Sequence, residues 1–326
     1  MKIRAAVLER FAEPLVVQDV ELAGPKAGEV LVRLHACGVC HTDMYTASGV
    51  DPSGYAPCVL GHEGAGVVEA VGEGVTSVAP GDHVVTLFSP QCGECVNCRS
   101  GKTNICVAIR EQQNAGYLPD GTTRLSRDGE PLRHFMGCST FAEATVMAEI
   151  SLAKVSPEAP HEAAALFACG LSTGLGAAMY RAQVEPGATV VVFGLGMVGL
   201  GAVVGSRLQG AERIIAVDLS EERLALARRH GATDTWIGGE GVVERVLEET
   251  GGFGADFTFE ATGNVGVMRQ AVESARMGWG VACMTGVAGK GETLDIVPRY
   301  LITGRKIMGA SFGGVKGREQ VPRLVD

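Results

Sequence analysis

"ATVVVFGLGMVG", residues 188–199, organises the second half of the chain. Its apolar, β-branched start at 188–193 predicts a buried strand, and Gly194, Gly196 and Gly199 follow in G-x-G-x-x-G spacing. In such a motif the first glycine permits a tight turn and the second lets a pyrophosphate approach the backbone. The third allows close packing of strand and helix, whose N-terminus faces the phosphates. The stretch therefore predicts a strand–turn–helix unit that binds a dinucleotide.

An acidic residue follows at the expected distance. Asp218 ends the next apolar run, nineteen residues after Gly199, where an acid binds the adenosine ribose hydroxyls. A carboxylate there repels a 2′-phosphate, so the pattern favours NAD over NADP, and Arg223 completes the predicted cofactor site. The alternative is a glycine-rich turn beside an unrelated surface aspartate, which leaves the combined spacing of strand, glycines and acid unexplained.

The pattern of strand-like and helix-like runs changes at about residue 165. Before it, short strand-like runs separated by Gly- and Pro-rich turns predict a mostly β domain over residues 1–165. After it, six strand-like runs alternate with helical runs, which predicts a doubly wound parallel sheet over residues 166–326. The six expected strands are 188–193, 213–218, 235–237, 255–261, 280–286 and 306–312. The predicted fold class is α/β with two domains.

Composition excludes several functions. The 326 residues carry 28 Lys and Arg against 37 Asp and Glu, a formal charge of −9 without a basic run, so neither nucleic acid nor an anionic membrane is an expected partner. The start of the chain lacks the apolar core of a secretory signal. Residues 188–205 run uncharged for a length near that of a membrane span, but five glycines favour strand, turn and helix instead. Ten cysteines without a secretory signal indicate thiols and metal ligands in a reducing cytoplasm.

Four cysteines gather in "CGECVNCRSGKTNIC", residues 92–106, with C-x2-C-x2-C-x7-C spacing. Four thiolates wrapped around one ion suit tetrahedral zinc. An iron–sulfur cluster also takes four thiolates, whereas disulfides would strain so short a loop. Because four thiolates fill the coordination of zinc, the cluster predicts a structural metal. Its members are Cys92, Cys95, Cys98 and Cys106.

A catalytic reaction then needs a different site, and three further segments contain suitable polar side chains. They are Cys40-His41-Thr42-Asp43, Gly61-His62-Glu63-Gly64 and ACGLSTG, which contains Cys169. Taken one at a time, each group also has a structural interpretation as a buried thiol, a satisfied histidine or a loop acid.

Together these motifs resemble the zinc-dependent medium-chain alcohol dehydrogenases, over the whole chain and in the family's order. The matching motifs are CGVCHTD, LGHEGAG, the four-cysteine loop, ACGLSTG and VFGLGMVG. CHTDMYTASG, PQCGEC, LPDGTTR and ARMGWGV look closest to the class III branch, the glutathione-dependent formaldehyde dehydrogenases. The resemblance implies a GroES-like catalytic domain, a Rossmann domain, NAD, two zinc ions per chain, and a homodimer or homotetramer.

The resemblance also implies roles for individual residues. Cys40, His62 and Cys169 would hold a catalytic zinc with an open position, with Glu63 behind the metal and Asp43 orienting the histidine. The four-cysteine loop would hold the structural zinc. Thr42 would take the proton of the alcohol, and His41 would contact the cofactor pyrophosphate. Hydride then passes from the alcohol carbon to the nicotinamide.

The substrate pocket matches less well. Asp51 and Arg110 match family residues that bind a thiol adduct, although Arg110 could equally be a solvated surface charge. Ser53 stands where the family has a glutamate, and Met277 replaces a lysine that pairs with the adduct. These departures favour another thiol carrier or a different alcohol. Relatives also continue beyond PRLVD, so a segment completing the catalytic domain is expected to be missing.

The leading hypothesis is a dehydrogenase that oxidises a thiol–formaldehyde adduct or a primary alcohol, in a reaction reversible to aldehyde reduction. A general alcohol dehydrogenase without preference for thiol adducts is the nearest alternative. A family member that binds NAD but has lost catalysis is the other.

Overall fold

The computed structural model describes residues 1–51, 54–102 and 104–326. It divides into two compact units, Met1–Cys169 with Lys316–Asp326, and Gly170–Val315. Each unit is described by itself.

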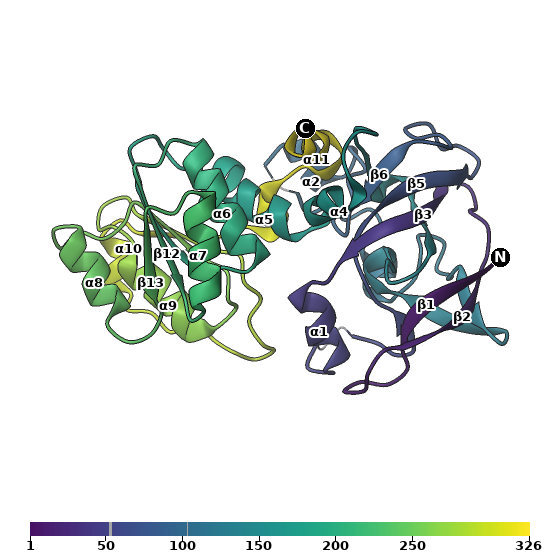
Figure 1. Ribbon diagram of the computed structural model, residues 1–326, viewed down its shortest axis with the longest axis horizontal. Coiled ribbons are helices and arrows are strands. Elements are labelled where there is room, and N and C mark those ends of the chain that lie inside the picture. Colours follow the sequence, from purple (N-terminus) through teal and green to yellow (C-terminus); the bar gives the residue numbers. More distant parts are fainter. Residues whose placement is uncertain (52–53, 103) are drawn as a thin grey trace. The chain divides into compact units, whose positions relative to one another are not determined.

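The first unit is mostly β, and Figure 1 shows α1 at the margin of its strands. Five strands close a barrel in the order β1-β2-β7-β8-β4, and five form a sheet in the order β10-β6-β5-β3-β9. The strands are β1 (Lys2–Leu8), β2 (Val16–Leu22), β3 (Glu29–Gly38), β4 (Cys58–Val59), β5 (Glu63–Val71), β6 (His83–Thr86), β7 (Leu125–Arg127), β8 (Glu130–His134), β9 (Ala144–Ala148) and β10 (Leu152–Lys154).

Short helices join these strands, and several of them carry the residues of interest. The helices are α1 (His41–Ala47), α2 (Val96–Ser100), α3 (Arg110–Asn114), η1 (Phe135–Gly137), η2 (Glu149–Ser151), α4 (His161–Ala164), η3 (Ala165–Ala168) and α11 (Gly317–Val325).

The second unit is a doubly wound sheet with strand order β13-β12-β11-β14-β15-β16, all parallel. Its strands are β11 (Thr189–Phe193), β12 (Arg213–Asp218), β13 (Asp234–Ile237), β14 (Phe257–Glu260), β15 (Val281–Met284) and β16 (Lys306–Gly309). Its helices are α5 (Gly170–Gly176), η4 (Ala177–Arg181), α6 (Met197–Leu208), α7 (Glu221–His230), α8 (Val242–Glu249), α9 (Val265–Ser274), α10 (Arg299–Ile302) and η5 (Ser311–Gly314).

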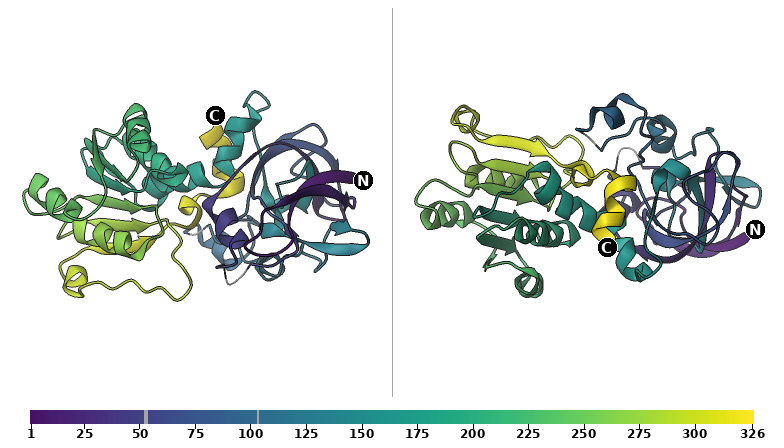
Figure 2. Two further views of the ribbon diagram at one scale, coloured as in Figure 1. Left: turned by 60° about the horizontal axis from the view of Figure 1, so that its bottom comes forward. Right: turned by 90° about the horizontal axis from the view of Figure 1, so that it is seen from above.

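Both faces of this sheet are covered, as the two views of Figure 2 show. Val190 and Val192 of β11 pack in one apolar cluster with residues of α6 and α7. Val191 and Phe193 point to the opposite face and pack with residues of α8 and α9. Burial on both faces explains why the strand is apolar throughout rather than alternating. All six predicted strands are present, with ends shifted by up to three residues.

The unit boundary differs from the prediction at both ends. Residues 166–169 and 316–326 were expected in the second domain but lie in the first unit. Helix α11 packs there because Val321 is fully buried and the Gly317 backbone lies against Leu87. A Cβ at Gly317 would be 2.6 Å from Leu87 Cδ1, so a larger residue would displace this buried side chain. The sequence shows the apolar face of this helix but not what covers it.

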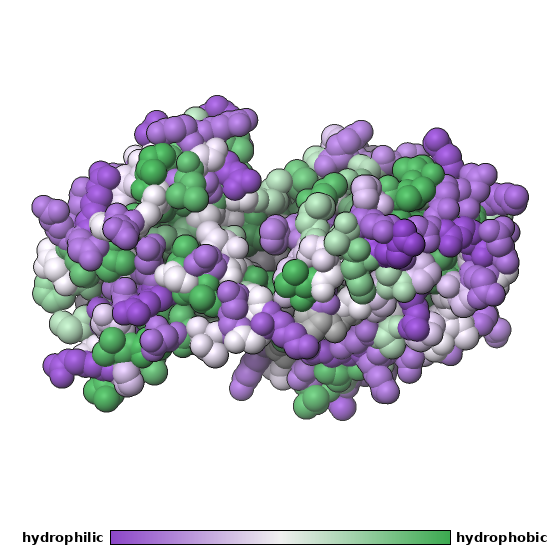
Figure 3. Space-filling model, turned by 90° about the horizontal axis from the view of Figure 1, so that it is seen from below, coloured by the Kyte–Doolittle hydropathy of each residue, from purple (hydrophilic) through white to green (hydrophobic). Residues whose placement is uncertain are grey.

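No single helix in the described part of the chain is long and apolar enough to span a membrane. Two helical segments joined by a bend, His161–Ala168 and Gly170–Arg181, reach the length and apolar composition of a span only when they are taken together. On the face drawn in Figure 3, hydrophilic residues cover much of the surface and apolar residues form small separate groups.

Candidate metal centres and dinucleotide site

Four side chains of the first unit bring metal-binding atoms together. One donor atom each from Cys40, His62, Glu63 and Cys169 lies within 4.8 Å of the others. Cys40 precedes α1, His62 immediately precedes β5, which begins at Glu63, and Cys169 follows η3. Two thiolates and an imidazole are ligands that zinc binds at ~2.0–2.3 Å in catalytic sites, which leave a fourth position for substrate. The donor set therefore fits zinc, with Glu63 close enough to approach the same ion.

Asp43 holds parts of this cluster in place through hydrogen bonds. Its carboxylate is buried and accepts hydrogen bonds from the backbone N–H of Cys40 at 2.9 Å and of Gly61 at 3.1 Å. Its Oδ1 also lies 3.2 Å from Nδ1 of the buried His62 ring. An Nδ1–H donated to Asp43 leaves Nε2 as the ligating nitrogen, the usual arrangement of a metal-bound histidine. One carboxylate thus fixes two backbone segments and one imidazole.

The donors also polarise one another. The hydrogen bond from the Cys169 thiol, helped by His62, lowers the pKa of Cys40 to about 3 despite burial. Burial opposes the imidazolium, but hydrogen bonds to Asp43 and Cys40 outweigh it and raise the pKa of His62 to about 10. The adjacent Cys40 thiolate and burial raise the pKa of Cys169 well above its usual value. A metal cation replaces the protons that His62 and Cys169 hold, so binding is coupled to proton release.

Glycines make room for the cluster. A Cβ at Gly38 would lie 2.2 Å from Glu63 Oε2, so the absence of a side chain there lets the carboxylate occupy its place. Gly61 has φ +88°, and a Cβ there would lie 2.6 Å from the Phe141 ring and backbone. Gly38 and Gly61 are therefore steric requirements of the site.

The residues predicted to accept the alcohol proton and to contact the pyrophosphate lie on α1. Thr42 is half-buried, and its Oγ1 lies 3.4 Å from Cys40 Sγ. His41 is exposed at the first position of the helix. Their predicted roles, proton acceptor and pyrophosphate contact, remain predictions.

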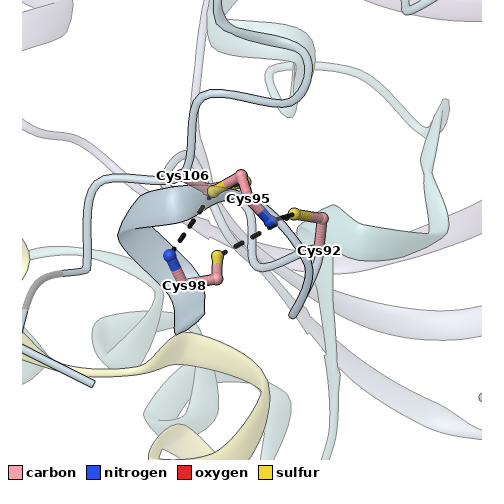
Figure 4. A group of neighbouring side chains, drawn as sticks. All are labelled: Cys92, Cys95, Cys98 and Cys106. Carbon is pink, nitrogen blue, oxygen red and sulfur yellow. Dashed lines mark hydrogen bonds between the residues drawn. The ribbon is translucent and has the colours of Figure 1, made fainter. Parts of the chain in front are cut away.

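The four-cysteine loop closes on itself, as Figure 4 shows. Cys92 Sγ and Cys98 Sγ are 3.9 Å apart, and Cys95 Sγ and Cys106 Sγ are 4.0 Å apart. Tetrahedral Zn–S bonds of ~2.3 Å require sulfur atoms ~3.8 Å apart, so the loop has the dimensions of a zinc site. The backbone N–H of Cys95 also donates to Cys92 Sγ at 3.3 Å, which stabilises a thiolate.

The pKa values of three thiols in the loop are shifted in different directions. Backbone N–H groups of Val107 and Cys98 lower the pKa of Cys95 to about 6. Burial raises the pKa of Cys98, and that of Cys106 to about 12. All four donor positions come from thiols, so a bound zinc would have no position for substrate. This geometry favours a structural role.

The predicted glycine motif forms the turn between β11 and α6. Gly194 has φ +85°, a conformation that favours glycine, and a Cβ there would lie 2.6 Å from Thr262 Cγ2. A Cβ at Gly199 would lie 1.7 Å from Gly194 O, so the helix contacts the turn directly. A Cβ at Gly196 would meet no atom within 4 Å among the described residues. The open side of Gly196 at a helix N-terminus fits the approach of a pyrophosphate.

Asp218 lies beside this turn. Its Oδ2 accepts a hydrogen bond from the Leu195 N–H at 2.7 Å, and its Oδ1 accepts one from the Ser220 N–H at 2.9 Å. The Arg223 guanidinium lies 3.8 Å from Asp218 Oδ2. The acid and the glycine turn are thus joined by a hydrogen bond. The predicted contact of Asp218 with the ribose and the contribution of Arg223 remain predictions.

The candidate substrate residues are less constrained. Asp51 is half-buried and its Oδ2 accepts a hydrogen bond from Thr46 Oγ1 of α1 at 2.7 Å. Arg110 is exposed at the start of α3, and Met277 is exposed after α9 in the second unit. Ser53 lies outside the described residues.

Two residues of interest escaped the sequence prediction. Gly38, which makes room for Glu63, is visible only as the glycine of "CGVC". Glu260 is fully buried at the end of β14, and its only sequence signal is an acid that closes an apolar run.

Comparisons with known proteins agree with this geometry. Residues 26–157 match the family model of the alcohol dehydrogenase GroES-like domain, and residues 197–326 match that of the zinc-binding dehydrogenases. The chain therefore belongs to the zinc-dependent alcohol dehydrogenases, which are nicotinamide-dinucleotide oxidoreductases.

Within this family, the chain is 54% identical to S-(hydroxymethyl)glutathione dehydrogenases of Escherichia coli (strain HS) and Shigella sonnei, with 100% of the chain covering 89% of each. Among solved structures, a zinc-binding alcohol dehydrogenase domain protein from Burkholderia ambifaria is 37% identical with a TM-score of 0.93. Benzyl alcohol dehydrogenase from Acinetobacter calcoaceticus is 32% identical with a TM-score of 0.92; in both cases 100% of this chain covers 88% of the other. The predicted family, fold and cofactor class are confirmed.

Proposed function

We propose that this dehydrogenase oxidises an S-hydroxymethyl thiol, the adduct of formaldehyde with a thiol, using NAD, and that simple primary alcohols are secondary substrates. The observation that carries the proposal is the convergence of Cys40, His62 and Cys169 on one point, with Glu63 beside it. The relatives at 54% identity are named for the glutathione adduct of formaldehyde, which supports the substrate class.

The chain's own residues would act in the following way. Zinc, when bound, makes a coordinated hydroxyl group more acidic, and NAD accepts the hydride. Asp43 keeps the His62 ring oriented through Nδ1. Thr42, whose Oγ1 lies 3.4 Å from Cys40 Sγ, would accept the hydroxyl proton and pass it toward solvent. The balance is one hydride to NAD and one proton released for each alcohol carbon that becomes a carbonyl.

The test compares NADH formation from formaldehyde with and without added thiol. We expect glutathione, cysteine or another small thiol to raise the rate at least tenfold, and simple alcohols to react with a higher KM. Equal rates with and without thiol would identify a general alcohol dehydrogenase instead. NADH binding without turnover of adducts, primary alcohols or aldehydes would identify a family member that has lost catalysis.

The proposed role of Arg110 can be tested separately. Its exposed guanidinium could pair with a carboxylate of the thiol carrier. Arg110→Ala should raise the KM for a carboxylate-bearing adduct about tenfold while leaving the KM for benzyl alcohol unchanged. Arg10→Ala removes another exposed arginine of the same unit and serves as the control.

Preference for NAD is proposed on the position of Asp218. Its carboxylate lies within hydrogen-bonding distance of the glycine turn, where a 2′-phosphate would be repelled. A structure 26% identical, described as a zinc-binding dehydrogenase from Sinorhizobium meliloti, is bound to NADP, so the choice of cofactor needs a direct test. Asp218→Ser should therefore lower the NAD/NADP ratio of kcat/KM.

We also propose that the chain works in the cytoplasm as a homodimer or homotetramer. Ten free cysteines, six of them in the two donor clusters, need a reducing compartment. The edge strand β16 and the exposed Leu301 and Ile302 of α10 support self-association. Light scattering of the purified chain and cell fractionation test these two points.

A further inference from the structure

Glu260 is a buried acid in the second unit that the proposed reaction does not use. It is the last residue of β14 and has no exposed surface. In the sheet it pairs with Phe193 of β11 on one side and with Met284 of β15 on the other. Strands β11 and β14 are the neighbours at which the strand order reverses, and ligands of such sheets bind at the carboxyl ends of the strands there. Glu260 therefore lies beneath the expected cofactor crevice.

One oxygen of Glu260 holds the turn that follows β14. Its Oε1 accepts hydrogen bonds from Thr262 N at 2.6 Å, Thr262 Oγ1 at 2.5 Å and Gly263 N at 2.9 Å. Thr262 Oγ1 in turn accepts a hydrogen bond from Asn264 N at 3.0 Å, at the start of α9. A single side-chain oxygen thus fixes the direction in which the chain leaves the strand.

This turn lies against the glycine motif. The methyl group of Thr262 is the atom that a Cβ at Gly194 would meet at 2.6 Å. The hydroxyl of the same threonine donates to Glu260, so the carboxyl group sets which side of Thr262 faces the Gly194 turn. A shift of Thr262 would move a contact of the turn that the pyrophosphate approaches.

The turn after β15 contacts Glu260 as well, through both its backbone and its side chain. The backbone oxygen of Glu260 accepts hydrogen bonds from Thr285 N at 2.9 Å and Gly286 N at 3.1 Å. A Cβ at Gly286 would lie 2.7 Å from Glu260 Oε2, so glycine is needed beside the carboxyl group. Oε2 itself is buried and has no hydrogen-bond partner among the described residues. Burying an acid with an unpartnered oxygen costs desolvation free energy. Its presence here therefore indicates a specific positional role.

We propose that Glu260 is a positioning residue for the dinucleotide, because its carboxyl group fixes the turn after β14 and, through Thr262, the contact of that turn with the glycine turn after β11. Its backbone oxygen holds the turn after β15 beside them. The inference rests on dinucleotide binding at this sheet. Glu260 does not touch the cofactor itself; it acts through Thr262, Gly263 and Gly286. Burial raises the pKa of Glu260 while the N–H donors oppose this, which agrees with an acceptor held in a desolvated place.

The experiment measures NADH binding by fluorescence titration, KM for NAD, kcat and thermal stability. Glu260→Ala removes all three bonds to Oε1, and we expect the Kd for NADH and the KM for NAD to rise at least tenfold while kcat at saturating NAD changes less than twofold. Glu260→Gln retains an acceptor of the same length and should bind within threefold of the parent chain. Thr262→Val removes only the hydroxyl and should weaken binding about threefold.

The matched control is Thr258→Val in the same strand. Thr258 is also fully buried, but its Oγ1 donates to Ala271 O of α9, away from the turns. It should lower thermal stability and leave the Kd for NADH unchanged. Parent-like binding by Glu260→Ala, or equal weakening by Thr258→Val, would overturn the proposal. If Glu260→Ala does not fold, Thr262→Val decides, and its unchanged affinity would overturn the proposal. Failure of the parent chain to bind NADH would instead refute the dinucleotide site.

Discussion

The Oδ1 atom of Asp43 lies 3.2 Å from Nδ1 of His62, and both side chains are 1% exposed. The same carboxylate also accepts the Cys40 and Gly61 N–H groups, so one acid orients two of the three expected zinc ligands. Such partners of metal-bound histidines are worth ~10–100-fold in metal affinity or activity.

Asp43→Asn tests this relationship. The amide keeps the shape of the carboxylate but loses its charge and presents a donor to one of its N–H partners. We expect zinc at the catalytic site to be lost to a chelator at least tenfold more readily, with kcat reduced to a similar degree. Asp82→Asn is the control, because Asp82 also accepts a backbone N–H but pairs with the exposed Lys154. Equal zinc retention in both variants would contradict the assignment.

The contact between Gly38 and Glu63 gives a steric prediction. A methyl group at Gly38 would lie 2.2 Å from Glu63 Oε2, so Gly38→Ala must displace the carboxylate. Overpacking of this kind costs about 1–3 kcal/mol, measurable by urea denaturation. The double variant Gly38→Ala/Glu63→Ala should recover most of this loss, since the colliding group is gone. Gly24→Ala, where a Cβ would meet no described atom within 4 Å, should be close to neutral. A loss in Gly38→Ala that Glu63→Ala does not relieve would place the strain elsewhere.

The structural zinc loop should stabilise helix α11. Gln91, next to Cys92, accepts a hydrogen bond from Arg318 N at 3.1 Å and donates one to Glu319 at 2.5 Å. Cys95→Ser should lower zinc content from two ions to one and increase amide hydrogen exchange over residues 317–325. Cys283→Ser, at a buried thiol outside both donor clusters, is the control. Unchanged exchange in α11 after loss of this zinc would show that the helix is held independently.

Much of this molecule could be predicted from the sequence, because both metal sites and the glycine turn depend on local spacing or on family motifs. The six strands of the second unit follow from apolar runs long enough to be buried on both faces. The helices between 161 and 181 were not predicted, since residues such as Gly174 and Ala178 are buried all round and give no amphipathic pattern. The docking of α11 and the role of Glu260 depend on partners far away in the sequence, which no local pattern reveals.

Acid should destabilise the first unit through His134. This side chain is fully buried, and burial with the nearby Arg124 charge lowers its pKa to about 3. Because the unfolded chain binds a proton near pH 6.5 and the folded chain does not, stability is full above ~6.5 and falls by about 1.4 kcal/mol per pH unit below it. His134→Gln keeps an acceptor for the Arg124 N–H and should flatten this slope, measured by urea denaturation at pH 7.5, 6.5 and 5.5 with zinc present. His230→Gln is the control, because it changes an exposed histidine and retains both His134 and the zinc ligands. It should therefore keep the slope of the parent chain. Parallel slopes for the parent and His134→Gln would mean that another buried group controls the acid transition.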